Sequence, residues 1–239
     1  MTTIPLKFIR DPAVGNADSA EDAKESTAML ERLVARVREE LAQLSPGAGA
    51  LRRADLLLQL GRALVRLEHG AEAWDAAREA FDLYLAEQAW EGAAQCCDIL
   101  FLASEEKSLA ALGQGIWLAV TYPIDPELTV ALLKHVVDET PPDADGAAVA
   151  AVAAYYVVDL RAQGPQREDL LLYANQQLAT VARRHSAVEN QQDFARWIER
   201  MELSDPALFL PRLRNVVDVL VQDDWWFDRK RLQAALPRA

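Results

Sequence analysis

The chain has 239 residues, 51% of them hydrophobic, and a formal net charge of −12 at pH 7. This length and apolar fraction are enough for a continuous buried core, which excludes a wholly disordered chain. The acidic balance repels a phosphate backbone at long range, so nucleic acid is not an expected partner. Local basic groups such as Arg229-Lys230-Arg231 are interpreted as solvated surface.

The two cysteines, Cys96 and Cys97, are neighbours in the sequence. Neighbouring side chains on a helix point in different directions, so a bond between these two would be strained, and a secreted disulfide framework is excluded. Reduced, buried thiols in a cytoplasmic protein are expected instead. We expect no secretion signal, because Pro5, Lys7 and Arg10 interrupt the first apolar residues. No apolar run reaches the roughly 18 residues of a membrane span, so no membrane partner is expected.

Residues 1–18 predict an extended or mobile arm, in which Ile4, Leu6 and Phe8 alternate with other residues. Alternating apolar residues can add to the edge of a partner's sheet, or lie along a groove of their own chain. Ile4, Leu6 and Phe8 are therefore candidate protein-binding residues.

Residues 19–239 predict a single all-α domain, with a subdivision near 141–146 as an alternative. Apolar residues recur there at helical spacing, and Gly and Pro fall in short clusters between the apolar segments. Asp125-Pro126 and Asp205-Pro206 each predict a helix start, with a capping carboxylate followed by Pro at the first helical position. We expect Gly70 to cap a helix end in the left-handed conformation. The whole pattern indicates about eleven helices joined by short loops, and no sheet.

One segment carries a family resemblance. Leu57-x2-Leu60-Gly61-x2-Leu64 keeps the spacing of the first helix of a tetratricopeptide repeat, and Ala77-x3-Phe81 resembles its second helix. Residues 54–86 thus resemble about one repeat, although Leu replaces the usual Trp and Tyr and the second signature lies about one turn late. The resemblance implies stacked antiparallel helix hairpins in a solenoid-like array, an architecture used mainly to bind other proteins.

A weaker internal similarity accompanies it. Ala73-Trp74 recurs as Ala89-Trp90 about 16 residues later, a shift that matches one helix plus its turn. A helical repeat and a chance likeness between two Ala-rich helices explain this similarity equally well.

Three large aromatic residues stand side by side near the C-terminus, Trp225, Trp226 and Phe227. Adjacent side chains diverge around a helix axis, so a helical domain rarely buries three such rings by itself. We expect Asp223-Asp224 to cap a last helix with Trp225 facing inward, which leaves Trp226 or Phe227 in need of other cover. Two interpretations stay open: a hydrophobic cap on the end of the array, or a binding hot spot. All three residues are candidate protein-binding residues.

Catalytic and metal-binding motifs are missing from the sequence. Helical di-iron and zinc-protease motifs need a Glu three residues before a His or a second His four residues away, and His69, His135 and His185 have neither. There is no Gly-x-Ser-x-Gly elbow, and no glycine-rich loop ends in Gly-Lys-Ser/Thr. An acid, Asp98, follows the cysteines where a cation would be needed to activate a thiol. We therefore expect no catalytic residue, no metal and no cofactor.

The preferred hypothesis is a cytoplasmic, non-catalytic adaptor or assembly factor that binds another protein through its helical surface and its aromatic C-terminal segment. One alternative is a maturation chaperone for a specific enzyme, because the composition resembles that of the chaperones of molybdenum enzymes, without their motif residues. Another is a helical enzyme or small-ligand-binding protein with a dispersed site. Residues for such a site would be Trp117, His135, Tyr155, Tyr156 and the two cysteines.

Overall fold

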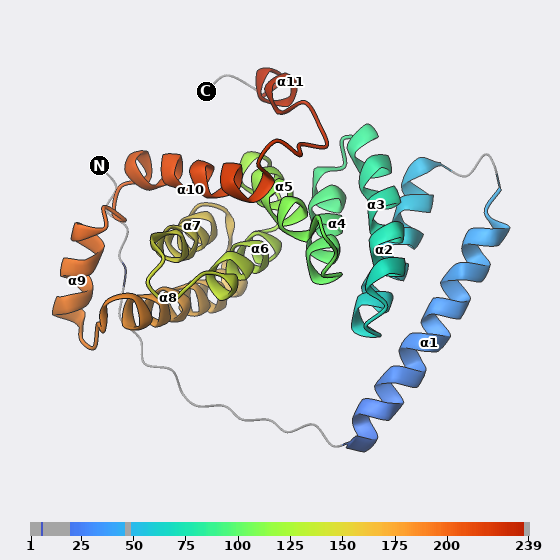
Figure 1. The fold of residues 1–239 in the computed structure, drawn as a ribbon, viewed down its shortest axis with the longest axis horizontal. Coiled ribbons are helices and arrows are strands. Elements are labelled where there is room, and N and C mark those ends of the chain that lie inside the picture. Colours follow the sequence, from blue (N-terminus) through green and yellow to red (C-terminus); the bar gives the residue numbers. More distant parts are fainter. Residues whose placement is uncertain (1–5, 7–19, 46–48, 237–239) are drawn as a thin grey trace.

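The structure is a computed structural model that describes residue 6, residues 20–45 and residues 49–236. Within these ranges every regular element is an α-helix, which confirms the all-α class and the expected number of about eleven helices (Figure 1). The helices are α1 (Ala20–Gln43), α2 (Ala50–Arg66), α3 (Gly70–Ala86), α4 (Trp90–Leu102), α5 (Ser108–Thr121), α6 (Pro126–Glu139), α7 (Asp145–Arg161), α8 (Gly164–Ser186), α9 (Gln191–Arg200), α10 (Pro206–Val221) and α11 (Arg229–Ala234).

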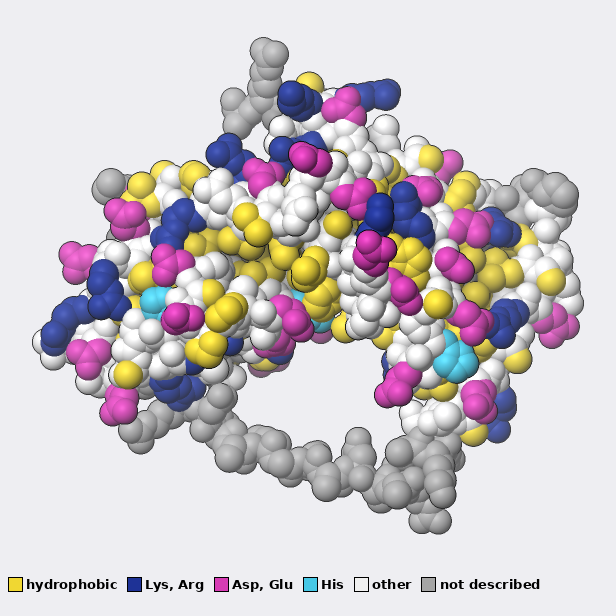
Figure 2. All heavy atoms as spheres, viewed as in Figure 1, with side chains coloured by type: hydrophobic (Ala, Val, Ile, Leu, Met, Phe, Trp, Pro, Cys, Tyr) yellow, Lys and Arg dark blue, Asp and Glu magenta, His cyan; other side chains and the backbone are white. Residues whose placement is uncertain are grey.

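Successive helices pack against one another along the chain from α1 to α9. Helix α10 departs from this order, because it returns across the molecule and packs on α5 and α7 (Figure 1). One hydrophobic core extends from Leu30 in α1 to Val221 in α10. Acidic and basic side chains are interspersed over the face shown in Figure 2, with apolar patches between them. The finer expectation of a tetratricopeptide-like solenoid stays a prediction, and the return of α10 is a feature that a strictly linear array lacks.

The turns after α2 and α3 share one geometry. Glu68 and Gln88 have left-handed backbones, with φ of 61° and 56°. In both turns the N–H of the next residue donates to the carbonyl oxygen five residues before it, at 2.9 Å, as in a Schellman motif. The expectation that Gly70 is the left-handed cap is wrong, because Glu68 holds that position and Gly70 begins α3. A Cβ on Gly70 would lie 2.5 Å from the carbonyl oxygen of Ala103, so this glycine permits close packing.

Both expected Asp-Pro helix starts are confirmed. The carboxylate of Asp125 accepts a hydrogen bond from the N–H of Glu127 at 2.8 Å and begins α6. The carboxylate of Asp205 accepts from the N–H of Ala207 at 2.9 Å and begins α10. These caps satisfy N–H groups that have no partner within the helix.

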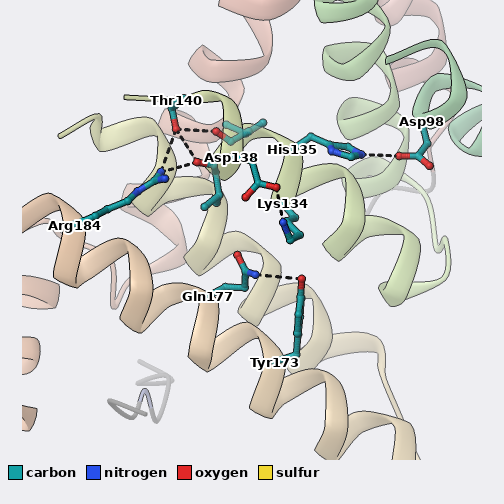
Figure 3. A network of polar contacts seen from close by, with 10 residues as sticks. Asp98, Lys134, His135, Asp138, Thr140, Tyr173, Gln177 and Arg184 are labelled. Carbon is teal, nitrogen blue, oxygen red and sulfur yellow. Dashed lines mark hydrogen bonds and ion pairs between the residues drawn. The ribbon is translucent and has the colours of Figure 1, made fainter. Parts of the chain in front are cut away.

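Arginines from neighbouring helices hold the C-terminal ends of three helices. Arg161 at the end of α7 donates to the carbonyl oxygens of Ala119 and Val120 in α5, at 2.6 and 3.0 Å. Arg184 of α8 donates to the carbonyl oxygen of Val137 near the end of α6 (Figure 3). Arg212 of α10 donates to the carbonyl oxygen of Met201, which follows the last residue of α9. The last carbonyls of a helix lack partners within it and carry partial negative charge, so a guanidinium stabilises them. Burial lowers the pKa of Arg161 from its ordinary value.

Replacing Arg161 with Met should lower the free energy of unfolding by about 2 kcal/mol, because two carbonyl groups lose a charged donor. Urea denaturation followed by circular dichroism measures the change. The control is Arg196→Met, which removes an arginine that is 66% exposed and should change the stability by less than about 0.5 kcal/mol. Equal losses in the two variants would show that Arg161 does not hold α5.

Candidate protein-binding site

Five of the six tryptophans lie in one aromatic cluster. Its rings make contacts with centroid separations from 4.2 to 6.4 Å. They come from α3, α4, the end of α5 and the segment between α10 and α11. The aromatic cluster consists of Trp74, Phe81, Trp90, Trp117, Tyr122, Trp225, Trp226 and Phe227. Residues distant in sequence thus meet at one place on the helix stack.

Residues 222–228, here called the connecting segment, join α10 to α11 without helical structure. The expectation that Asp223-Asp224 cap the last helix is therefore wrong. Helix α11 begins at Arg229, and the carboxylate of Asp228 caps it by accepting from the N–H of Arg231 at 3.0 Å. Because this backbone is not helical, three adjacent aromatic side chains reach one surface instead of diverging around an axis.

Trp226 joins the connecting segment to α3. Its ring meets the rings of Trp74 and Phe81 edge to face, with centroids 6.1 and 5.4 Å away. The guanidinium carbon of Arg78 lies 4.4 Å from the centroid of the same indole. Edge-to-face and cation–π contacts each add to the energy of burial.

Trp225 and Phe227 extend the contact to α5. Both rings approach Trp117, at 6.2 and 5.2 Å between centroids. The guanidinium of Arg229 lies 4.4 Å from the centroid of Trp225. All three aromatic residues of the segment are half-buried against their own chain, which favours the interpretation as a hydrophobic cap. Their role in binding another protein stays a prediction.

The backbone of the connecting segment is held by a buried amide. Gln114 of α5 is fully buried, and its Oε1 accepts from the N–H of Trp226 at 2.8 Å. Its Nε2 donates to the carbonyl oxygen of Asp224 at 3.4 Å, and Lys107 forms an ion pair with the carboxylate of Asp224 at 3.1 Å. A buried amide is costly unless it is paired. The docked segment therefore satisfies a polar group inside α5.

A groove of about 930 Å³ opens beside the aromatic cluster. We call it the α11 groove. On one side Trp90 stacks on Tyr122, with centroids 4.2 Å apart and planes 10° from parallel. On the other side lie Leu232 and Leu236, in α11 and just after it. Phe227 of the connecting segment also lines the groove. Its other lining residues are Leu85, Ala86, Gln88, Thr121, Pro123, Asp228, Arg231 and Ala235.

The structure places the other sequence-based candidates separately. Leu6 is half-buried and packs against the core, while Ile4 and Phe8 lie outside the described residues. His135 of α6 contacts Asp98 of α4 at 2.8 Å (Figure 3). The residues of the dispersed-site hypothesis have other neighbours: Tyr156 packs on Phe209, Trp117 joins the aromatic cluster, and Tyr155, Cys96 and Cys97 are buried. None of them lines the α11 groove.

A further polar arrangement was not found from the sequence. Ser186 Oγ lies 2.7 Å from Nδ1 of His185, whose Nε2 lies 3.1 Å from the carboxylate of Asp145. This order of groups is that of a Ser-His-Asp triad. However, the indole N–H of Trp197 donates to the same Nδ1 at 3.3 Å, and Arg200 donates to Ser186 Oγ at 2.9 Å. These contacts occupy the would-be base and nucleophile, so the arrangement serves to join α7, α8 and α9.

Comparison of the chain with family models, with curated proteins and with solved structures found no match. In the described ranges, no helix is both long enough and apolar enough to cross a membrane. The same part of the chain contains no group of three or more His, Cys, Asp or Glu side chains placed to hold a metal ion. The candidate site therefore rests on the geometry of the α11 groove and the aromatic cluster.

The two thiols should make the stability depend on pH. Burial raises the pKa of both Cys96 and Cys97 in the folded chain. Above the ordinary thiol pKa of about 8.5 the unfolded chain loses these protons, whereas the folded chain keeps them. The stability that the protonated thiols contribute is therefore fully present below that pH and is lost as the pH rises above it. We expect the free energy of unfolding to fall by up to about 1.4 kcal/mol per pH unit for each thiol. Urea titrations between pH 7 and 9.5 measure this slope, and an unchanged slope in the Cys96→Ala, Cys97→Ala variant would contradict the assignment.

Trp226→Ala distinguishes the two interpretations of the aromatic residues. If Trp226 anchors the connecting segment, its loss should lower the free energy of unfolding by about 3 kcal/mol, because a large ring and its contacts are removed. Thermal and urea unfolding measure the loss. Val219→Ala, at a residue that is 72% exposed, is the control and should change the stability by less than about 0.5 kcal/mol. A Trp226→Ala variant as stable as the control would favour the binding hot spot.

Proposed function

We propose that the chain is a cytoplasmic, non-catalytic adaptor or assembly factor that binds another protein in the α11 groove. The observation that carries the proposal is an open groove between two apolar walls, the Trp90–Tyr122 stack and the leucines Leu232 and Leu236. Interaction sites are enriched in aromatic residues packed at their centre. The packing of each helix from α1 to α9 on the next supports regarding the stack as a tetratricopeptide-like array within this proposal.

The limited burial of α11 supports a binding role for this groove. Helix α11 has six residues and no fully buried one, and Leu232 and Leu236 pack only partly against the core. Figure 1 shows its ribbon outside the helix stack. A helix this short is not stable by itself, so its stability depends on the contacts of its apolar face. A partner in the groove would complete the burial of Leu232 and Leu236.

In this proposal the partner contacts the α11 groove, beside Trp225 and Trp226, instead of those two residues themselves. Trp225 and Trp226 are engaged with α3 and α5, so replacing them would disturb the fold and binding together. Leu232 and Leu236 face the groove and are half-exposed. They are therefore the better residues for testing a partner.

The test is affinity capture from cell lysate with the full chain and two double variants. Leu232→Gln, Leu236→Gln changes the groove, and Leu160→Gln, Leu172→Gln changes leucines that are 65% and 49% exposed on α7 and α8. We expect a stoichiometric partner that the control variant retains and the groove variant captures at least about tenfold less, since two apolar contacts are lost. Circular dichroism checks that both variants fold.

Retention of the partner by the groove variant, or equal loss in both variants, would overturn the proposal. Capture of an enzyme subunit in its precursor form alone would favour the maturation chaperone. The volume of about 930 Å³ lies within the range of small-ligand sites, so ligand binding in the same groove is the second candidate. A raised melting temperature with a small molecule, absent in the groove variant, would favour that function.

A further inference from the structure

Helix α11, which borders the α11 groove, begins with basic residues in an acidic chain. Helix α11 begins with Arg229-Lys230-Arg231, whereas the whole chain has a net charge of −12. Figure 2 shows Lys and Arg side chains at this end of the molecule, with Asp and Glu side chains among them. The first three residues of α11 are therefore opposite in sign to the net charge of the protein, and Asp228 precedes them.

The three basic residues have different neighbours. Arg229 forms an ion pair with Asp218 at 2.5 Å and lies over the ring of Trp225. Lys230 and Arg231 are exposed, and among the described residues neither side chain forms an ion pair. Arg231 also lines the groove. Within the described part of the chain, its guanidinium is thus available to a molecule bound in the groove.

The acid of the groove already has a structural role. Asp228 lines the groove, and its carboxylate accepts the N–H of Arg231 to cap α11. It therefore stabilises the helix start, where negative charge is favourable. Among the described residues, the lining then offers two apolar walls and a cation without an ion-pair partner, Arg231.

On the basis of the proposed function, we propose that the occupant is an amphipathic helix of another protein. Its apolar face would lie between the Trp90–Tyr122 stack and Leu232, and an Asp or Glu on its flank would pair with Arg231. A guanidinium and a carboxylate form two parallel hydrogen bonds, which fixes the orientation of the helix.

A helix fits the walls of the groove because its backbone hydrogen bonds are internal, so only side-chain contacts are required. An extended peptide adds to the edge of a sheet, and the described residues include no strand. The net charge of −12 repels a strongly acidic partner at long range. The occupant is therefore a helix with an acid at one flank rather than an acidic tail.

The experiment is a selection from a displayed library of helical peptides of about 20 residues, a length at which helices form. Apolar residues are fixed at helical spacing, and the flanking positions are random. The library is selected on the full chain and counter-selected on the Leu232→Gln, Leu236→Gln variant. We expect groove-dependent peptides to be enriched about threefold in Asp and Glu at one flank, in keeping with the strength of an exposed ion pair.

Selection on two charge variants tests the role of Arg231. Arg231→Glu should reverse the flank preference toward Lys and Arg, and Arg231→Gln should abolish it. Arg196→Glu, at an arginine of α9 that is 66% exposed, should leave the preference as it is in the unaltered chain. Circular dichroism checks that all three variants fold.

A neutral or basic flank in the groove-dependent peptides, or a preference unchanged by Arg231→Glu, would overturn the inference. Selection that yields no groove-dependent peptide would overturn it as well. If lysate capture still depends on Leu232 and Leu236, the proposed function stands and the helical occupant is wrong. If capture is independent of these leucines, the proposed function falls together with the inference.

Discussion

A buried side-chain amide has to keep both of its ends paired, and Gln114 in the middle of α5 meets that requirement with the backbone of the connecting segment. The position of the connecting segment depends on this contact. Helix α10 returns across α5 and α7, and so brings the carbonyl group of Asp224 and the N–H of Trp226 to Gln114. The aromatic side chains then join α3 to α5, and Phe227 becomes part of the groove. One internal polar contact thereby connects the fold to the candidate site.

The helical class and the Asp-Pro helix starts could be predicted because they depend on local residues. A cap at Asp125 or Asp205 involves atoms two residues away, and apolar spacing needs only one helix. The 16-residue similarity stays open between a repeat and a chance likeness; Ala73 lies inside α3, whereas Ala89 precedes α4. The return of α10 depends on contacts between residues about 100 positions apart, for which no local pattern exists.

The candidate site was only partly predictable for the same reason. The run from Trp225 to Phe227 lies beside the α11 groove, but helical geometry was the wrong basis for the directions of its side chains. No sequence pattern indicated that Trp90 and Tyr122 stack on each other, because Trp90 begins α4 and Tyr122 follows the last residue of α5. Arg231 belongs to the basic group Arg229-Lys230-Arg231, which was interpreted as solvated surface because charged residues are mostly exposed. Its position in the groove became evident only from the fold.

The crowding of indoles has an optical consequence. Trp74 and Trp226 lie 6.1 Å apart, and Trp117 and Trp225 lie 6.2 Å apart. At such separations the electronic transitions of two indoles couple, and the pair absorbs circularly polarised light differently from isolated rings. Each of these pairs has one member on the helix stack and the other on the connecting segment. The near-ultraviolet dichroism of the unlabelled chain therefore reports whether the segment is docked, and it gives a direct spectroscopic view of any partner that displaces it.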